Sequence, residues 1–325
     1  MKQYKELLQK VLDYGDLRND RTGVGCYSVF GHQMEFNLKK GFPIVSIKKT
    51  NWRAAFYEMI WFLRGDTNTK YLKDRKIQIW NEWQDKNGSI GPGYGASMRG
   101  WQYANLQNRV YYSIPIALVN GKIVDVDESK FHESRYIRTD HKEWTKENDA
   151  YMPDEWEPTL THIDQFANFV DGLKNNPASR RHIISLWHPG RIAEQALPPC
   201  HGLIVQGFVS SDKDFDLHIY QRSCDLLIGG SFNIAQWAFF AHLVSKLCML
   251  TPRKLIISYG DVHIYSNQII AAQKTIKREP IEQQITLLIK RDIRTIREIE
   301  TLEIDSDIEI LNYKHHPYIQ IPVAT

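Results

Sequence analysis

Cysteine is scarce in this sequence, and the few cysteines lie far apart. Only four occur in 325 residues, Cys26, Cys200, Cys224 and Cys248, and no two form a CxxC pair. A zinc ribbon or a disulfide framework needs closely spaced or numerous cysteines, so neither is indicated and no metal site is predicted. A cysteine outside those roles is a small buried hydrophobe or a nucleophile.

An excess of one charge is also missing. Lysine and arginine number 41 and aspartate and glutamate 38, which gives a formal charge of +3. This is too small to indicate broad binding to nucleic acid or a membrane surface, so an anionic ligand would have to be held by local arginines. With 42% hydrophobic and 24% charged residues, the composition rules out a disordered or fibrous chain.

Long uninterrupted hydrophobic runs are absent as well. The opening segment MKQYKELLQKVLDYGD has no apolar core typical of a signal peptide. The nearest candidate for a membrane span, residues 232–250, contains Asn233, Gln236, His242 and Lys246, and is interpreted as a buried core helix. We therefore expect a cytoplasmic protein.

Repeats and Gly/Pro-rich linkers are not visible, which favours one domain over residues 1–325. Periodicity predicts an α+β fold. Helices are predicted at 4–14, 52–63, 164–173, 234–248 and from 266, and strands at 25–38, 42–47, 182–186, 203–209, 215–220 and 254–259. The polar segment at about 103–158 is interpreted as an inserted subdomain, with a hairpin turn at Asn120 and Gly121.

Two windows contain residue types suited to covalent and acid–base chemistry. In ALPPCHG, two prolines fix the backbone before Cys200, and Arg222 in YQRSCD is a candidate for lowering its pKa. Glu58 lies within the apolar stripe of the predicted helix 52–63, where a carboxylate is costly unless paired or used. From this window alone, the default interpretation of Cys200 is a small buried structural cysteine, and a nucleophile is the alternative.

Several further positions suit a nucleotide, each with a plainer alternative. Arg21, Arg180, Arg181 and Arg222, the last followed by Ser223, suit a phosphate, or they are solvated surface charges. His263 and Tyr265 lie two apart on a predicted strand and share a face, as sugar-binding groups or as a core pair. Asn233 is a helix N-cap or a reader of a planar base, and Trp80 and Trp83 stack on a flat ligand or pack in the core.

Taken together, the sequence resembles the thymidylate synthase family. The resemblance is carried by DRTGVGCYSVFG, residues 56–66 with Glu58, IWNEW, GPGYG, PASRRHI, ALPPCHG, YQRSCD, SFNIA, GDVHIYSN and PYIQIPVA. It implies a single α+β domain with a large mixed β-sheet flanked by helices, and a homodimer in which these sheets pack back to back. It also implies folate-dependent one-carbon transfer to C5 of deoxyuridylate (dUMP), with methylenetetrahydrofolate as co-substrate.

The resemblance assigns roles residue by residue. Catalytic roles fall to Cys200, Glu58, Tyr94, Arg222, Asp225 and Asn233, with the Cys200 thiolate adding to C6 and Glu58 and Tyr94 moving the C5 proton. Substrate binding falls to Arg21, Arg180, Arg181, His201, Gln221, Ser223, His263 and Tyr265, with Arg180 and Arg181 donated by the partner subunit. Folate contacts fall to Ile79, Trp80, Trp83, Leu197, Asp225, Gly229, Phe232 and Ala324.

Three departures from the family pattern leave the final step open. Ser231 stands where the family has proline, Met98 where it has tryptophan, and Thr325 where it ends in an aliphatic residue. Each could admit water, in which case a 5-hydroxymethylase would replace the synthase, which takes a hydride from the folate. A nucleic-acid-binding or regulatory protein on the same fold is a third, remote interpretation, which the near-neutral charge disfavours.

Overall fold

The computed structural model describes residues 1–20, 22–105, 116–119, 122–125 and 159–323. By internal contacts the chain forms two units. The main unit comprises residues 1–101 and 163–325, and the smaller one comprises residues 102–162. Every functional residue predicted from the sequence belongs to the main unit, although Arg21 and Ala324 lie outside the described residues.

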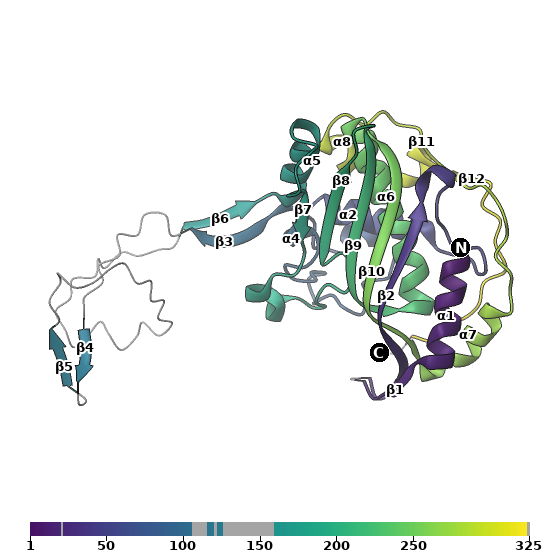
Figure 1. Cartoon of the computed structure of the whole chain (residues 1–325), viewed down its shortest axis with the longest axis horizontal. Coiled ribbons are helices and arrows are strands. Elements are labelled where there is room, and N and C mark those ends of the chain that lie inside the picture. The colour runs from purple at the N-terminus through teal and green to yellow at the C-terminus, as the bar shows by residue number, and fades with distance from the viewer. Residues whose placement is uncertain (21, 106–115, 120–121, 126–158, 324–325) are drawn as a thin grey trace. The chain divides into compact units, whose positions relative to one another are not determined.

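A mixed β-sheet of six strands is the centre of the main unit (Figure 1). Its order is β1 (Asp16–Arg18), β2 (Cys26–Asn37), β10 (Thr251–Tyr265), β9 (Asp214–Asp225), β8 (Ile204–Val209) and β7 (Ile183–Ser185). β9 and β10 run parallel, and the other neighbours are antiparallel. The predicted α+β class with a large mixed sheet is confirmed.

The sheet has one core face and one partly open face. Along β8 burial alternates residue by residue, with Val205 and Val209 buried and Ile204 and Phe208 exposed. This is the period-two pattern of a strand that packs on one side only. The open face retains large apolar side chains.

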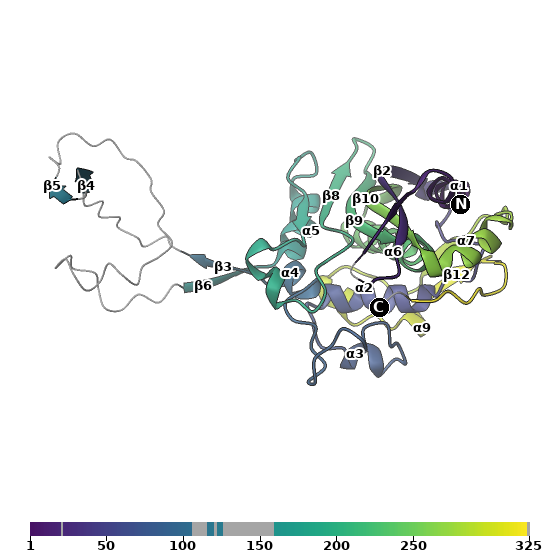
Figure 2. The same cartoon turned by 90° about the horizontal axis from the view of Figure 1, so that it is seen from below.

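Helices cover the core face. The main ones are α1 (Lys2–Tyr14), α2 (Trp52–Leu63), α5 (Gln165–Asn175), α6 (Ser231–Cys248) and α7 (Ile269–Ile276). Short helices are α3 (Lys70–Lys73), α4 (Gly95–Arg99), α8 (Ile296–Glu300) and α9 (Ile304–Asp307). α2 and α6 lie on the same side of the sheet (Figure 2), where Phe56 stacks on Phe239 with ring centroids 4.0 Å apart.

The apolar segment Leu226–Cys248 contains α6 and is long and apolar enough to cross a membrane by length and composition. However, 78% of its most apolar window is buried inside the protein. That is the environment of a core helix, as the sequence predicted for residues 232–250. The helical turn Leu226–Gly230 leads from the end of β9 directly into α6.

The prediction of a strand at 42–47 is wrong. Ile44, Val45 and Ile47 are fully buried, but the segment has no strand partner. Isolated hydrogen bonds serve its backbone instead: the Phe42 N–H donates to the carbonyl of Ile285, and the Tyr313 hydroxyl donates to the carbonyl of Val45, both at 2.8 Å. Buried β-branched residues therefore fill the core here without forming a ladder.

The smaller unit contains paired strands. β3 (Trp101–Asn105) pairs with β6 (Thr159–Ile163), and β4 (Ile116–Val119) pairs antiparallel with β5 (Lys122–Asp125). The register joins Val119 to Lys122, as a two-residue hairpin requires. The predicted turn residues, Asn120 and Gly121, lie outside the described residues. In the main unit, β11 (Thr286–Ile289) pairs with β12 (Ile308–Leu311).

Candidate active site

Cys200 lies in the loop that leads into β8, and Arg222 on β9 holds that loop. The Arg222 guanidinium donates through Nε to the carbonyl of Pro199 at 2.8 Å and through Nη2 to that of Pro198 at 3.1 Å. The backbone N–H of Arg222 donates to the carbonyl of Cys200 at 2.9 Å. Proline supplies a carbonyl and a fixed φ, so this pair of prolines gives Arg222 two well-placed acceptors.

Tyr94 is the side-chain partner of Cys200. Its hydroxyl accepts the backbone N–H of Cys200 at 2.9 Å and lies 3.4 Å from Sγ. The Tyr94 ring stacks on Phe62 of α2 with centroids 4.4 Å apart. Tyr94 has a φ of 29°, a conformation that costs free energy in a residue with a side chain and is held by this packing.

The pKa of the Cys200 thiol is raised, chiefly by burial. The hydrogen bond from Tyr94 and the charge of Arg222 lower this pKa, as the sequence suggested for Arg222, and the charge of Glu58 raises it. Burial is the larger effect, so the thiol is protonated at neutral pH before a ligand is bound. A substrate phosphate or ring that changes this environment would alter the thiolate fraction.

Glu58 lies on α2 and is only 5% exposed. Trp80 donates its indole N–H to Oε1 at 2.6 Å, and the Gln236 amide donates to Oε2 at 2.6 Å. Burial raises the pKa of Glu58 to about 7, although both hydrogen bonds act to lower it. A carboxyl group that titrates near neutrality can take and return a proton, which is the property of a general acid–base.

His201, next to Cys200 in the sequence, is held as a neutral imidazole. The Trp237 indole N–H of α6 donates to His201 Nδ1 at 3.1 Å, and burial lowers the pKa of His201 to about 3. Because Nδ1 accepts, the ring proton resides on Nε2, which can donate to a ligand. The arrangement suits a neutral hydrogen-bond donor.

Glycine is required at position 202, because Trp237 packs closely against its backbone. A Cβ at Gly202 would lie 2.1 Å from Trp237 Cζ2, and the residue has a φ of +65°. We expect Gly202→Ala to lower the free energy of unfolding by about 2–4 kcal/mol through overpacking and backbone strain. Urea denaturation measures it, with Gly190→Ala as control, since a Cβ there meets nothing closer than 3.6 Å. Equal midpoints for the two variants would contradict the close packing of Trp237 on this loop.

Asp225 ends β9 and is tied to the carboxyl-terminal segment. Its Oδ1 accepts the N–H of Ile228 at 3.1 Å, and its Oδ2 accepts the Gln268 amide at 2.8 Å. The same Gln268 amide nitrogen donates to the carbonyl of Pro322 at 3.1 Å. Burial raises the pKa of Asp225. One glutamine therefore connects this carboxylate to the last described turn of the chain.

Asn233 lies in the first turn of α6 and is 4% exposed. The N-cap interpretation is wrong, because the helix begins at Ser231 and its N-cap is Gly230. A Cβ at Gly229 would lie 3.3 Å from Asn233 Oδ1, so glycine there leaves room beside the amide oxygen. The Asn233 amide therefore lies in the first turn of α6, beside Gly229.

Ser231, one of the departures from the family pattern, contacts a buried lysine. Lys48 Nζ donates to Ser231 Oγ at 2.7 Å, and both side chains are buried. Burial lowers the pKa of Lys48 to about 8, whereas the charge of Asp225 raises it. Met98 is buried on α4, and Thr325 lies outside the described residues. Nothing in the sequence around Lys48 singles it out as a site residue.

The remaining sugar- and phosphate-type candidates lie on β9 and β10. His263 pairs in register with Asp225, and its Nδ1 lies 2.9 Å from Asp261 Oδ1. The rings of His263 and Tyr265 are 5.0 Å apart, so the two side chains share a face as predicted. Gln221 is buried, and its amide donates to the carbonyl of Ser223 at 3.1 Å.

Other candidates lie at the surface. Arg180 and Arg181 are exposed in the turn before β7. The predicted folate contacts differ in burial. Trp80 is buried against Glu58 and Tyr94, whereas Ile79 is exposed. The others that the structure describes are partly buried: Trp83, Leu197, Gly229 and Phe232. The indole N–H of Trp80 is therefore engaged by the Glu58 carboxylate, and the partly exposed apolar residues are available to contact a ligand. Gln236, Trp237 and Gln268 were not selected from the sequence as site residues.

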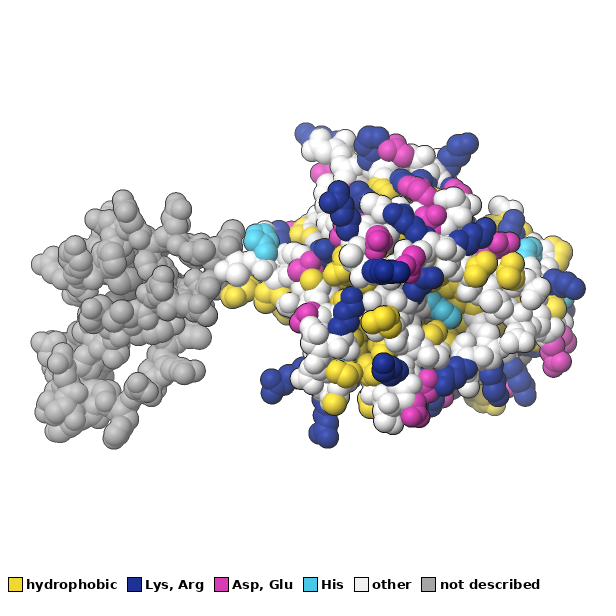
Figure 3. Space-filling view, turned by 90° about the horizontal axis from the view of Figure 1, so that it is seen from above, with side chains coloured by type: hydrophobic (Ala, Val, Ile, Leu, Met, Phe, Trp, Pro, Cys, Tyr) yellow, Lys and Arg dark blue, Asp and Glu magenta, His cyan; other side chains and the backbone are white. Residues whose placement is uncertain are grey.

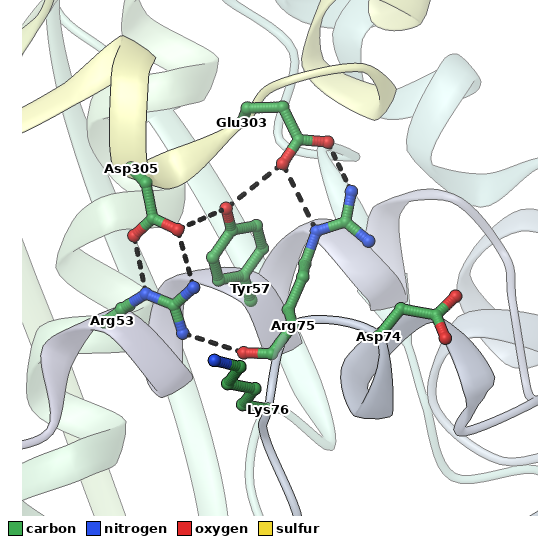
Figure 4. Close-up of a pocket in the computed structure, with 7 residues that line it drawn as sticks. All are labelled: Arg53, Tyr57, Asp74, Arg75, Lys76, Glu303 and Asp305. Carbon is green, nitrogen blue, oxygen red and sulfur yellow. Dashed lines mark hydrogen bonds and ion pairs between the residues drawn. The ribbon is translucent and has the colours of Figure 1, made fainter.

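A separate polar cavity of about 440 Å³ lies at α2 and the segment 303–305 (Figure 4). Its lining includes neither Cys200 nor Glu58. Arg53 forms a two-pronged ion pair with Asp305 at 2.5 and 2.6 Å, and Arg75 pairs with Glu303. Because both guanidinium groups are already neutralised, this cavity joins α2 to the carboxyl-terminal region and is not a second anion site.

Charges of both signs are interspersed on the upper face of the main unit (Figure 3). Among the described residues no group of three or more His, Cys, Asp or Glu side chains could hold a metal ion. The family model described as thymidylate synthase matches residues 2–325. That match spans essentially the whole chain and includes the Cys200 loop, Glu58 and Asn233, and members of this family are transferases that use methylenetetrahydrofolate as co-substrate. The chain belongs to the thymidylate synthase family.

Proposed function

We propose that this protein transfers one carbon from methylenetetrahydrofolate to C5 of dUMP, forming thymidylate and dihydrofolate. The observation that carries the proposal is the proximity of a thiol to two proton-transfer groups. Tyr94 contacts both Sγ and the backbone of Cys200, and Glu58 interacts electrostatically with both residues. Nucleophile and acid–base groups are thus within one buried site.

In this proposal Cys200 attacks C6 of the pyrimidine. The thiol loses its proton, a bond forms between sulfur and C6, and the ring electrons shift to C5 as an enolate. Asn233 orients the base, Arg222 and Ser223 bind the phosphate, and His263 and Tyr265 bind the ribose. C5 then bonds to the methylene carbon of the co-substrate, and Glu58, with a pKa of about 7, helps to remove the C5 proton as tetrahydrofolate leaves. Hydride transfer to the exocyclic carbon completes the methyl group and expels the sulfur from C6. Burial excludes water from these steps.

The co-substrate supplies the methylene carbon and, in a synthase, the hydride. The partly buried apolar residues Trp83, Leu197 and Phe232 suit a flat aromatic ligand, since aromatic and aliphatic side chains stack on such rings. Asp225, whose pKa is raised by burial, provides the polar group at the folate side. Gln268 connects it to the carboxyl-terminal segment.

A hydroxymethylase is the alternative that one observation favours. Ser231 and Lys48 place a hydroxyl and an ammonium group near Asp225, where the family pattern has a proline. Polar groups there could hold the water that replaces the hydride. Thymidylate synthesis remains our first proposal, because it needs no feature beyond the site described.

Product analysis distinguishes these reactions. Purified protein is incubated with dUMP and methylenetetrahydrofolate, the nucleotide is identified by mass, and dihydrofolate is followed by absorbance. Thymidylate with an equal amount of dihydrofolate supports the proposal. A nucleotide heavier by one oxygen, formed without dihydrofolate, would establish the hydroxymethylase, and no product would contradict both.

We also propose that two copies of the chain pack through the open face of the sheet. Large apolar side chains are exposed there, namely Phe30 on β2, Ile183 on β7, Ile204 and Phe208 on β8, and Tyr220 on β9. Exposed apolar side chains on one face of a sheet are typical of a protein interface. In such a dimer, Arg180 and Arg181 would bind the substrate phosphate in the partner's site.

We further propose that residues 102–162 are an insertion into the catalytic domain.

Phe208→Glu tests the interface. Phe208 is 55% exposed in one chain, so a glutamate is tolerated in the monomer but places a charge in the proposed interface. We expect sedimentation to show monomers, with activity lower by at least about tenfold if arginines are donated across it. Ile270→Glu is the control, because Ile270 is 67% exposed on α7. A Phe208→Glu dimer with full activity would contradict the proposal.

A further inference from the structure

Gln236 is a buried amide on α6, a largely apolar helix, and it hydrogen-bonds Glu58. It is 0% exposed on α6, and its Nε2 lies 2.6 Å from Glu58 Oε2. Burying an amide costs free energy unless it is hydrogen-bonded, and a bond to an ionised partner offsets that cost most effectively. The contact across α2 and α6 is therefore a specific one.

We propose that Gln236 is a positioning residue that hydrogen-bonds Glu58 in both protonation states of the carboxyl group. The inference rests on the proposed function, in which Glu58 takes up and releases a proton. With Glu58 ionised, Gln236 donates Nε2–H to Oε2, as the structure has it. With Glu58 protonated, a half turn of the amide presents Oε1 as acceptor for the carboxyl O–H.

The two partners of Glu58 differ in what they can do. The Trp80 indole is a donor only, so its bond to Oε1 serves the ionised form. Gln236 has a donor and an acceptor at one end of a single rotatable group. Its Oε1 is buried and has no hydrogen-bond partner among the described residues, so no competing bond opposes the turn. Gln236 can therefore donate to the ionised carboxylate and accept from the protonated carboxyl group, whereas Trp80 can only donate.

Other titratable groups near Glu58 do not replace this role. The Cys200 thiol and the Tyr94 phenol interact with it electrostatically, and burial raises the pKa of both. His201, in ring contact with Tyr94 and with Phe62 of α2, stays neutral because burial lowers its pKa to about 3. On α6, Gln236 is the described residue with a hydrogen bond to the carboxyl group.

The test uses Gln236→Met, which preserves length and removes both the donor and the acceptor. The Glu58 pKa is measured by ¹³C NMR on protein labelled at glutamate carboxyls, with the Glu58 signal identified by its loss in Glu58→Gln. Infrared difference spectra of acidified protein report the carbonyl stretch of protonated Glu58. Gln165→Met is the matched control, because Gln165 is an amide that bonds the backbone of Ser97 and Ser185 and does not contact Glu58.

In Gln236→Met we expect the pKa of Glu58 to rise by about one pH unit or more, because the ionised carboxylate loses one charge-assisted hydrogen bond. The carbonyl stretch of the protonated acid should move to higher frequency, and the acid limb of the kcat profile should follow the pKa, with KM for dUMP little changed. Gln165→Met should alter none of these. An unchanged pKa, or an unchanged carbonyl stretch, in Gln236→Met would overturn the inference.

The two proposals fail separately. If wild-type protein yields no nucleotide product, the proposed function is wrong, while the NMR and infrared measurements still decide whether Gln236 bonds both forms of Glu58. If product forms normally and these spectra do not change in Gln236→Met, the proposed function stands and the role of Gln236 is wrong.

Discussion

Replacement of Cys200 by serine is expected to lower kcat by about 10⁴-fold or more, because the step that activates C5 needs a thiolate and a serine hydroxyl does not ionise near neutral pH. The measurement is steady-state turnover with dUMP and methylenetetrahydrofolate. The variant should still bind dUMP, because the residues proposed to bind its phosphate and ribose are unchanged. This is the largest effect that the site predicts.

Cys248→Ser is the control for this experiment. Cys248 is buried on α6, and its thiol is directed at the carbonyl of Val170, 3.9 Å away. It should retain nearly full activity. Turnover of Cys200→Ser within tenfold of the wild-type protein would contradict the assignment of the nucleophile.

Replacement of Glu58 by glutamine is expected to reduce kcat by about 10²- to 10⁴-fold through loss of a general acid–base. The midpoint near pH 7, set by the raised pKa of Glu58, should disappear from the kcat profile. Glutamine preserves the shape and can still accept from Trp80, so the fold should remain. A profile that keeps its midpoint near pH 7 in this variant would assign that titration to another group.

The same pKa has a consequence for stability. Burial raises the pKa of Glu58 from 4.5 to about 7, so between these values the folded protein binds more protons than the unfolded chain. The free energy of unfolding therefore falls as pH rises through this window, by about 3 kcal/mol for this group. In Glu58→Gln that part of the pH dependence should be absent, which urea titrations at pH 4.5 and 8 can measure.

Sequence reasoning was most successful where local pattern and packing agree. The predicted helix 52–63 matches α2, which is buried on all sides from Ala54 to Leu63, and the strands at 25–38 and 203–209 match β2 and β8, which pack apolar side chains into the same core. It was wrong at 42–47, where apolar residues lie in the core without a strand partner. Periodicity measures burial, and only tertiary contacts decide whether a ladder forms.

The sequence singled out Cys200 and Glu58 as candidate reactive groups, but it did not single out the residues that hydrogen-bond to Glu58 and His201 from α6. A resemblance identifies Cys200 and Glu58 by motif, but Gln236 and Trp237 act through side chains that cross from α6 to another segment. The one available signal was Gln236 itself, a polar residue within an apolar run. The pairing of Gly202 with Trp237 needs the three-dimensional distance, because each residue alone fits many roles.

The most direct test of the account uses dUMP that has fluorine at C5, together with methylenetetrahydrofolate. Fluorine cannot leave as a cation, so an adduct formed by sulfur attack at C6 and carbon transfer to C5 cannot release its nucleotide. Peptide mass spectrometry should find the nucleotide and the folate bound to the peptide that contains Cys200, in about one equivalent per active site. An unmodified Cys200 peptide, or an adduct on another residue, would contradict covalent catalysis by Cys200.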